Sequence, residues 1–226
     1  MLLSLKRFYH RQRIKANQES APLLACWDNS HYNFSGDWRD QEFLVADTET
    51  SGLNVDEGEL LSIGWVVVSG GQIKLDSARH ILLTPEESVG QSASIHLIRD
   101  CELEDGICPS EMMREFLQVA AGKVLVFHHA SLDIGFLDLW SKRLYGSRLL
   151  LPISDTLELE KRKILRKEDA IPNGALRLGG CRERYGLPDY PAHNALVDAL
   201  ATAELLVAHA VHKSSKVKTR ELLEIL

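Results

Sequence analysis

Two carboxylates one residue apart follow an apolar run in the stretch FLVADTETSGL, residues 43–53. Residues i and i+2 of a strand point to the same face, so Asp47 and Glu49 would lie side by side while Thr48 points away. Like charges so close repel each other unless a cation lies between them. Hard oxygen ligands at a strand end suit Mg²⁺ or Mn²⁺, which leave room for phosphate groups. A D-x-E occurs roughly once by chance in a chain of this composition, so a solvated strand end is the alternative.

Two further acidic residues stand on the first turns of predicted helices. Asp133 lies in VLVFHHASLDIGFLD, on the first turn of a helix that follows an apolar strand. The helix dipole and capping alone explain its position equally well. Asp198 lies in YPAHNALVD, where Pro191 favours extended chain before a helix that Asn194 starts. In combination with the D-x-E pair, Asp133 would bring a third acidic group to the same sheet edge.

His193 stands on the loop before that last helix. This position lets its imidazole swing over whatever Asp198 ligates, and an imidazole titrates near neutral pH, as a general base must. A histidine near a helix start is more often structural than catalytic, so the position of His193 alone favours a structural role.

The hydrophobic pattern predicts the elements that position these residues. Three strands joined by hairpins come first, and the period then changes from two to that of helices. The predicted strands are 42–47, 60–68, 72–83, 123–127 and 149–153, and the predicted helices are 111–121, 131–145, 157–167, 174–185 and 194–212. Strands first and strand–helix alternation afterwards imply a mixed α/β sheet with helices on its faces.

Length and composition fit one globular domain with extensions. The chain has 226 residues, of which 45% are hydrophobic, and its formal net charge of -6 gives no general attraction to nucleic acid or anionic membranes. Four cysteines without C-x-x-C spacing argue against zinc and disulfides and favour a reducing, cytoplasmic location. No apolar run approaches the ~18 residues of a membrane span, so no membrane partner is expected. We expect an N-terminal extension at 1–40, a main domain at 41–212 and a C-terminal tail helix at 213–226.

The N-terminal extension begins with MLLSLKRFYHRQRIKA and ends in NSHYNFSGDW. The apolar residues of its start precede the basic ones, which is the reverse of a secretory signal and favours a surface helix, with a transit peptide left open. The turn formers and aromatics of its end predict an irregular lead-in to the domain.

Together these segments resemble the DEDDh 3′-to-5′ exonucleases of the ribonuclease H-like fold, which include the proofreading epsilon subunit of bacterial DNA polymerase III. The family motifs D-x-E-T-T/S-G-L, H-N-A-x-F-D-x-x-F-L and H-x-A-x-x-D-A occur in order within residues 41–210. They are matched by Asp47, Glu49, Thr50, Ser51, Gly52 and Leu53; by His128, Ala130, Asp133, Phe136 and Leu137; and by His193, Ala195, Asp198 and Ala199. His129 replaces the usual Asn and Leu132 the usual Phe, both beside the substrate strand in the family.

The resemblance implies a mixed sheet of three antiparallel strands and then parallel strands, flanked by helices. It also implies metal-dependent release of nucleoside monophosphates from single-stranded DNA 3′ ends. In the family, four carboxylates hold two divalent ions, Mg²⁺ or Mn²⁺, one generating hydroxide and the other stabilising the leaving 3′ oxygen. The residues carried over to these roles are Asp47, Glu49 and Asp198 for the nucleophile-side ion, Asp47 and Asp133 for the second, and His193 as general base. Substrate contacts are implied for Thr50, Ser51, Gly52, Leu53, His96 and His129.

Three questions of partner and substrate stay open. One alternative is an RNA-trimming exonuclease of the same family, which would differ in its contact to the 2′-hydroxyl. The T-S-G-L version of the first motif favours the DNA-proofreading branch. A non-catalytic nucleic-acid-binding module would keep the fold, but all five catalytic positions hold competent residues. Little chain follows the last family helix, so we expect a stand-alone or differently partnered exonuclease rather than one with a clamp- or polymerase-binding tail.

Two basic clusters are candidate guides for a nucleic-acid strand. They are Lys161, Arg162 and Lys163 with Arg166 and Lys167, and, in the tail, Lys213, Lys216, Lys218 and Arg220. Most charge runs are simply solvated faces, so the clusters alone indicate little.

Overall fold

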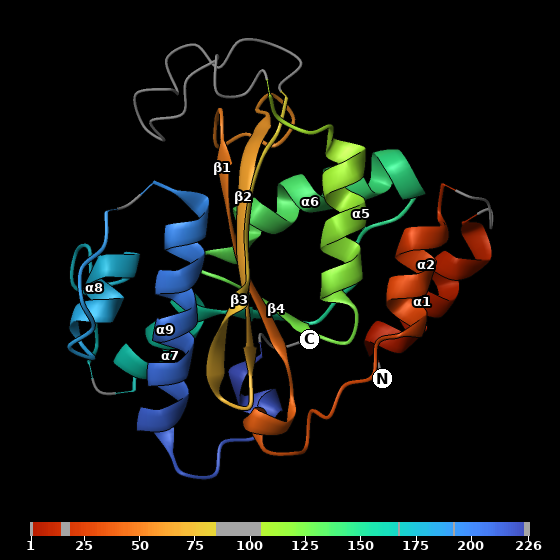
Figure 1. Ribbon diagram of the computed structural model, residues 1–226. Coiled ribbons are helices and arrows are strands. Elements are labelled where there is room, and N and C mark those ends of the chain that lie inside the picture. Colours follow the sequence, from red (N-terminus) through yellow and green to blue (C-terminus); the bar gives the residue numbers. More distant parts are fainter. Residues whose placement is uncertain (1, 15–18, 85–104, 167, 192, 224–226) are drawn as a thin grey trace.

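A five-stranded mixed sheet forms the centre of the computed structural model, which describes residues 2–14, 19–84, 105–166, 168–191 and 193–223 (Figure 1). The strands are β1 Phe43–Thr50, β2 Leu60–Ser69, β3 Gln72–Leu82, β4 Val124–Phe127 and β5 Ile153–Asp155. Their order is β3-β2-β1-β4-β5, with β1 to β3 antiparallel and β1, β4 and β5 parallel. This is the predicted fold class.

Helices cover both faces of this sheet. The helices are α1 Leu2–Arg13, α2 Ala21–Asp28, α5 Pro109–Ala120, α6 Ala130–Tyr145, α7 Thr156–Ile164, α8 Leu178–Glu183 and α9 Ala195–Lys213, with 3-10 helices η1 Trp38–Asp40 and η3 Thr219–Leu222. In Figure 1, α7, α8 and α9 lie on one side of the sheet, and α1, α2, α5 and α6 lie on the other. Each face therefore packs against its own apolar layer.

The alternation along β1 decides which layer each side chain enters. Leu44 and Ala46 pack in the layer of α5 and α6, whereas Phe43 and Val45 pack in the layer of α9. Because strand side chains alternate, the next odd-numbered residues of β1 also face α9. The side chains of Asp47 and Glu49 therefore project from the face of the sheet that α9 covers.

Three predicted elements differ from those observed. The last strand begins at Ile153 rather than at Leu149, because the preceding segment is held by the N-terminal helices: Arg7 donates to the Leu150 carbonyl at 2.8 Å and Trp27 to the Leu149 carbonyl at 2.6 Å. The helix predicted at 174–185 is shortened to α8, and the described part of the tail, up to residue 223, forms the 3-10 turn η3 in place of the predicted helix.

The N-terminal extension contributes more ordered structure than a lead-in. It forms the predicted surface helix, α1, and a second helix, α2, that packs against α5. The stretch between α2 and η1 is irregular, as its turn formers predict. The extension therefore supports the layer of α5 and α6.

Within the described part of the chain, α9 is the one helix long and apolar enough to cross a membrane by length and composition. Half of its apolar window is buried, and it packs on β1 and β2. These contacts are those of a core helix.

Candidate metal centre

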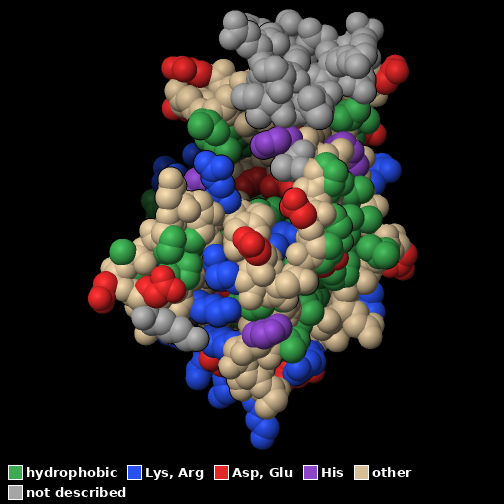
Figure 2. All heavy atoms as spheres, turned by 90° about the vertical axis from the view of Figure 1, so that its left-hand side faces the viewer, with side chains coloured by type: hydrophobic (Ala, Val, Ile, Leu, Met, Phe, Trp, Pro, Cys, Tyr) green, Lys and Arg blue, Asp and Glu red, His purple; other side chains and the backbone are tan. Residues whose placement is uncertain are grey.

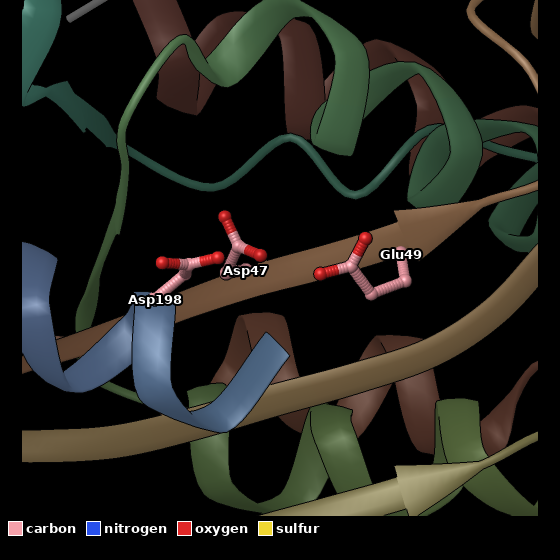
Figure 3. Close-up of side chains that lie close together, drawn as sticks. All are labelled: Asp47, Glu49 and Asp198. Carbon is pink, nitrogen blue, oxygen red and sulfur yellow. The ribbon is translucent and has the colours of Figure 1, made fainter. Parts of the chain in front are cut away.

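Three carboxylates converge where α9 meets the end of β1. Asp47 and Glu49 project from β1, and Asp198 projects toward them from the first turn of α9 (Figure 3). One ligand oxygen of each residue lies within 4.8 Å of the others. Among the residues that the structure describes, this is the one group of acidic, histidine or cysteine side chains so close together. The predicted association of these three residues is present.

Asp133 approaches the same strand from its other side. β4 pairs with β1 only from Phe43 to Val45, so the backbone of β1 beyond this point has no strand partner there. The Thr48 backbone N–H donates to Asp133 Oδ1 at 3.0 Å, and the Thr48 hydroxyl donates to the same oxygen at 2.7 Å. Asp133 is therefore buried beside the three carboxylates but serves β1 as a hydrogen-bond acceptor.

A glycine on β2 allows α9 to reach the carboxylates of β1. Gly64 is the cross-strand partner of Asp47. A Cβ at Gly64 would lie 2.2 Å from the Leu196 nitrogen and 2.4 Å from the Ala195 carbonyl carbon, both backbone atoms of α9. The sequence reasoning missed this residue, although a glycine inside the apolar run LLSIGWVVV is the signal of a close backbone approach.

The first turn of α9 is ordered by two side-chain caps. Asn194 Oδ1 accepts from the Val197 N–H at 3.1 Å, and Asp198 Oδ2 accepts from the His193 N–H at 2.8 Å. The backbone of His193 has a left-handed φ of 69°, which turns the chain sharply into the helix. Its imidazole is exposed at the edge of the site.

The surroundings of these carboxyl groups favour their protonated, uncharged form. Burial, followed by the charges of Asp198 and Asp133, raises the pKa of Glu49 to about 7. Burial and the same neighbours raise the pKa of Asp47 well above its ordinary value. Burial also raises the pKa of Asp198, although the His193 N–H opposes this. A divalent cation would remove the repulsion, and carboxylate oxygens are the donors that Mg²⁺ and Mn²⁺ prefer, so the residues fit such an ion.

The metal-free protein is expected to lose stability as pH rises. The raised pKa of Glu49 means that the folded state binds the proton more tightly than the unfolded chain. This contribution is complete below the unfolded value of about 4.3 and is lost as pH rises through about 7. Thermal melts in EDTA at about pH 5 and about pH 8 measure the loss, and Mn²⁺ should reverse it at the higher pH. An EDTA melting temperature that is unchanged or higher at the higher pH would contradict this prediction.

The loop after β1 has a mainly structural set of hydrogen bonds. Thr50 Oγ1 donates to the Gly52 carbonyl at 2.9 Å, and Ser51 Oγ accepts from the Glu59 N–H at 2.8 Å. Leu53 instead leaves 84% of its area exposed, which is unusual for a large apolar side chain. Of the substrate contacts implied for this loop, Leu53 is the one whose side chain is exposed.

The two histidines after β4 have different surroundings. His128 is largely buried between the Thr156 hydroxyl, 2.8 Å from Nδ1, and the Leu176 carbonyl, 2.9 Å from Nε2. Burial lowers its pKa, so the neutral ring donates from Nε2 to the carbonyl. His129 takes a left-handed φ of 76°, a conformation that Asn and His tolerate better than most residues. His129 is therefore compatible with the backbone turn that leads into α6.

Asp155, at the end of β5, holds the turn on which both histidines stand. Its carboxylate accepts from the backbone N–H groups of His129 and Ala130, each at 2.9 Å. It thereby caps the start of α6 and places the helix that carries Asp133. His96, the remaining predicted contact, lies outside the described residues.

Comparison with protein families gives a match over most of the chain. The family model described as exonuclease (RNase_T) matches residues 44–206. A DNA polymerase III PolC-type protein of Thermotoga maritima is 32% identical over 169 residues, covering 74% of this chain and 12% of its own length. The DNA polymerase III epsilon subunit of Salmonella typhimurium is 29% identical over 177 residues, covering 73% of this chain and 70% of its own. The chain thus spans only a small part of the PolC-type relatives.

Solved structures share the fold at lower identity. The nuclease domain of 3′hExo, a DEDDh family member bound to rAMP, has a TM-score of 0.66 and 13% identity, covering 81% of this chain and 98% of its own. Exonuclease X in complex with 5′ overhanging duplex DNA has a TM-score of 0.57 and 22% identity, covering 80% and 97%.

Proposed function

The chain belongs to the exonuclease family, and from this premise we propose that it is a metal-dependent 3′-to-5′ exonuclease that removes nucleoside monophosphates from single-stranded DNA. The observation that carries the proposal is the meeting of Asp47, Glu49 and Asp198 at the end of β1, with ligand oxygens within 4.8 Å. The DNA polymerase III names of its relatives support DNA and a proofreading or repair type of activity. A cytoplasmic location is part of the same expectation.

Each acidic residue has a place in the proposed hydrolysis. Asp47, Glu49 and Asp198 would hold one divalent ion, Mg²⁺ or Mn²⁺, and Asp47 and Asp133, the latter fixed by Thr48, would hold a second. Bound divalent ions would supply charge neutralisation at the scissile phosphate and a more acidic water. The buried carboxylates contribute a preorganised set of donors, since β1 and α9 hold them before the substrate arrives.

His193 is the proposed general base, and the loop after β1 is the proposed contact to the last nucleotide. The exposed imidazole stands next to Asp198, to which its own backbone N–H is bonded. From there it would take the proton of the attacking water. Leu53 would cover the terminal base with its exposed side chain, and the break at Ser51 and Gly52 would let backbone amides approach the terminal nucleotide.

Replacement of His193 with alanine should lower turnover by about a hundredfold, the usual effect of removing a positioned base. Mn²⁺ affinity should be preserved, because the bond to Asp198 comes from the backbone. Steady-state digestion of a labelled oligonucleotide, with Mn²⁺ titration by calorimetry, separates the two effects. His31→Ala, at another exposed histidine, is the control. Wild-type turnover of His193→Ala with metal bound would remove this role.

The direct test of the function is digestion of matched 5′-labelled single-stranded DNA and RNA oligonucleotides with Mg²⁺ or Mn²⁺. A ladder that shortens from the 3′ end and is absent in EDTA establishes the activity. The DNA-to-RNA rate ratio then decides between a DNA-proofreading type and an RNA-trimming type. Folded protein that binds the strands without cleaving them would instead identify a nucleic-acid-binding module.

A further inference from the structure

A cavity of about 240 Å³ lies between α7, α9 and the C-terminal segment, away from the carboxylates. Basic side chains from different parts of the chain line it. They are Arg162, Lys163 and Arg166 from α7 and the turn after it, and His212 and Lys213 from the end of α9; Glu221 is the one acidic residue of the described lining. Four formal positive charges thus face one carboxylate.

The partners of these cations leave much of the positive charge uncompensated. Arg162 donates to the carbonyls of Glu158 at 3.2 Å and Leu223 at 3.1 Å, which carry no formal charge. Lys213 pairs with Glu221 at 3.3 Å. Arg166 is exposed and has no ion pair within the described part of the chain. Within the described lining, Arg162 and Arg166 therefore remain as positive charges after the Lys213–Glu221 ion pair is formed.

A buried network fixes the wall of this cavity. Glu160 is fully buried and accepts from Arg184 at 3.0 Å, from His209 Nδ1 at 2.7 Å and from the Tyr185 hydroxyl. Lys163 Nζ lies 3.9 Å from the centre of the Tyr185 ring. Because Tyr185 and His209 are both lining residues, the network holds two sides of the cavity in place and gives its cations a rigid support.

Helix dipoles explain only part of this arrangement. Basic residues at the C-terminal ends of α7 and α9 are favourable by themselves. That effect does not require cations of both helices to face one shared cavity. Arg and Lys together are the usual ligands of phosphate groups, the former by paired N–H donors and the latter as a point charge. We propose that this cavity binds a phosphate group.

The cavity is separate from the carboxylate site. Asp198 is on the first turn of α9 and Lys213 is its last residue, so the two lie about 22 Å apart along the helix axis. On the face of the molecule drawn in Figure 2, Lys and Arg side chains gather below a hollow with recessed acidic side chains. The phosphate belongs either to the backbone of the substrate strand upstream of its 3′ end, which rests on the proposed function, or to a free phosphate compound.

Titration with inorganic phosphate in EDTA tests the site without any hydrolysis. Ring resonances of His209 and His212 should shift on binding. Arg166→Gln should weaken binding about fivefold, as the loss of an exposed charge contact predicts. Lys216→Gln removes the same charge from an exposed lysine outside the cavity and should have no effect. Glu221→Gln removes the one acid and should tighten binding.

Digestion kinetics then identify the source of the phosphate. If the strand backbone occupies the cavity, Arg166→Gln raises KM for an octanucleotide. KM for a dinucleotide and kcat for both substrates then stay unchanged. If the ligand is a free phosphate compound, KM is unchanged at both lengths while phosphate binding is weakened. The proposal is overturned if phosphate shifts neither histidine, or if Arg166→Gln and Lys216→Gln weaken binding equally. An inactive protein that still binds phosphate here would refute the exonuclease and keep this site.

Discussion

Replacement of Asp198 with alanine is expected to abolish hydrolysis and to weaken Mn²⁺ binding. Asp198 is the one ligand of the three that α9 supplies, so its loss leaves the ion with donors from β1 alone. The loss in turnover should exceed the roughly hundredfold effect expected for the general base. Oligonucleotide digestion and calorimetric Mn²⁺ titration measure the two losses.

The stability of the metal-free Asp198→Ala variant should depend less on pH than that of the wild type. Asp198 raises the pKa of Glu49 and of Asp47, so without metal it repels both. Loss of the hydrogen bond from the His193 N–H lowers the stability of the variant, whereas the relief of repulsion acts only where the carboxyls ionise. In EDTA, the melting temperature of Asp198→Ala should therefore fall less between about pH 5 and about pH 8 than that of the wild type, and Mn²⁺ should raise it less. Asp189→Ala removes an exposed carboxylate from the preceding loop and controls for net charge. Wild-type digestion by Asp198→Ala would show that this cluster is not the catalytic centre.

Replacement of Gly64 with alanine should disable the site without touching any ligand. The added Cβ would stand 2.2 Å from the Leu196 nitrogen, and this atom belongs to the backbone, so α9 must shift away from β2. That shift separates Asp198 from Asp47. Misplacement by about 1 Å can cost about a hundredfold in rate, and Mn²⁺ affinity should fall with it. We also expect a stability loss of about 1–3 kcal/mol from overpacking.

A matched glycine distinguishes this effect from a general response to a methyl group. Gly179 lies in α8 with no atom within 4 Å of the position of its Cβ, so Gly179→Ala should be neutral or slightly stabilising. Circular dichroism verifies that both variants are folded, and Mn²⁺ titration of the folded proteins gives the comparison. Wild-type Mn²⁺ affinity in folded Gly64→Ala would show that α9 does not need this close approach.

The pairing of Asp47 with Glu49 on one face was predictable because it depends only on the period of a strand. Local signals also predicted α9 and the position of Asp198 on its first turn, since Asn194 caps the helix as expected. The hairpin and strand–helix patterns predicted three consecutive paired strands within a mixed α/β sheet, and this fold class was confirmed. These features are set by interactions between residues close in sequence.

Other features required the packed molecule. Asp133 bonds to Thr48, which is 85 residues away and faces the opposite layer from Asp47, so no local pattern indicates that contact. The start of β5 depends on Arg7, 143 residues from its partner Leu150. The distance between Asp198 and β1 depends on the missing side chain of Gly64. A local period decides which way a side chain points, but only the close packing of distant segments decides what it meets there.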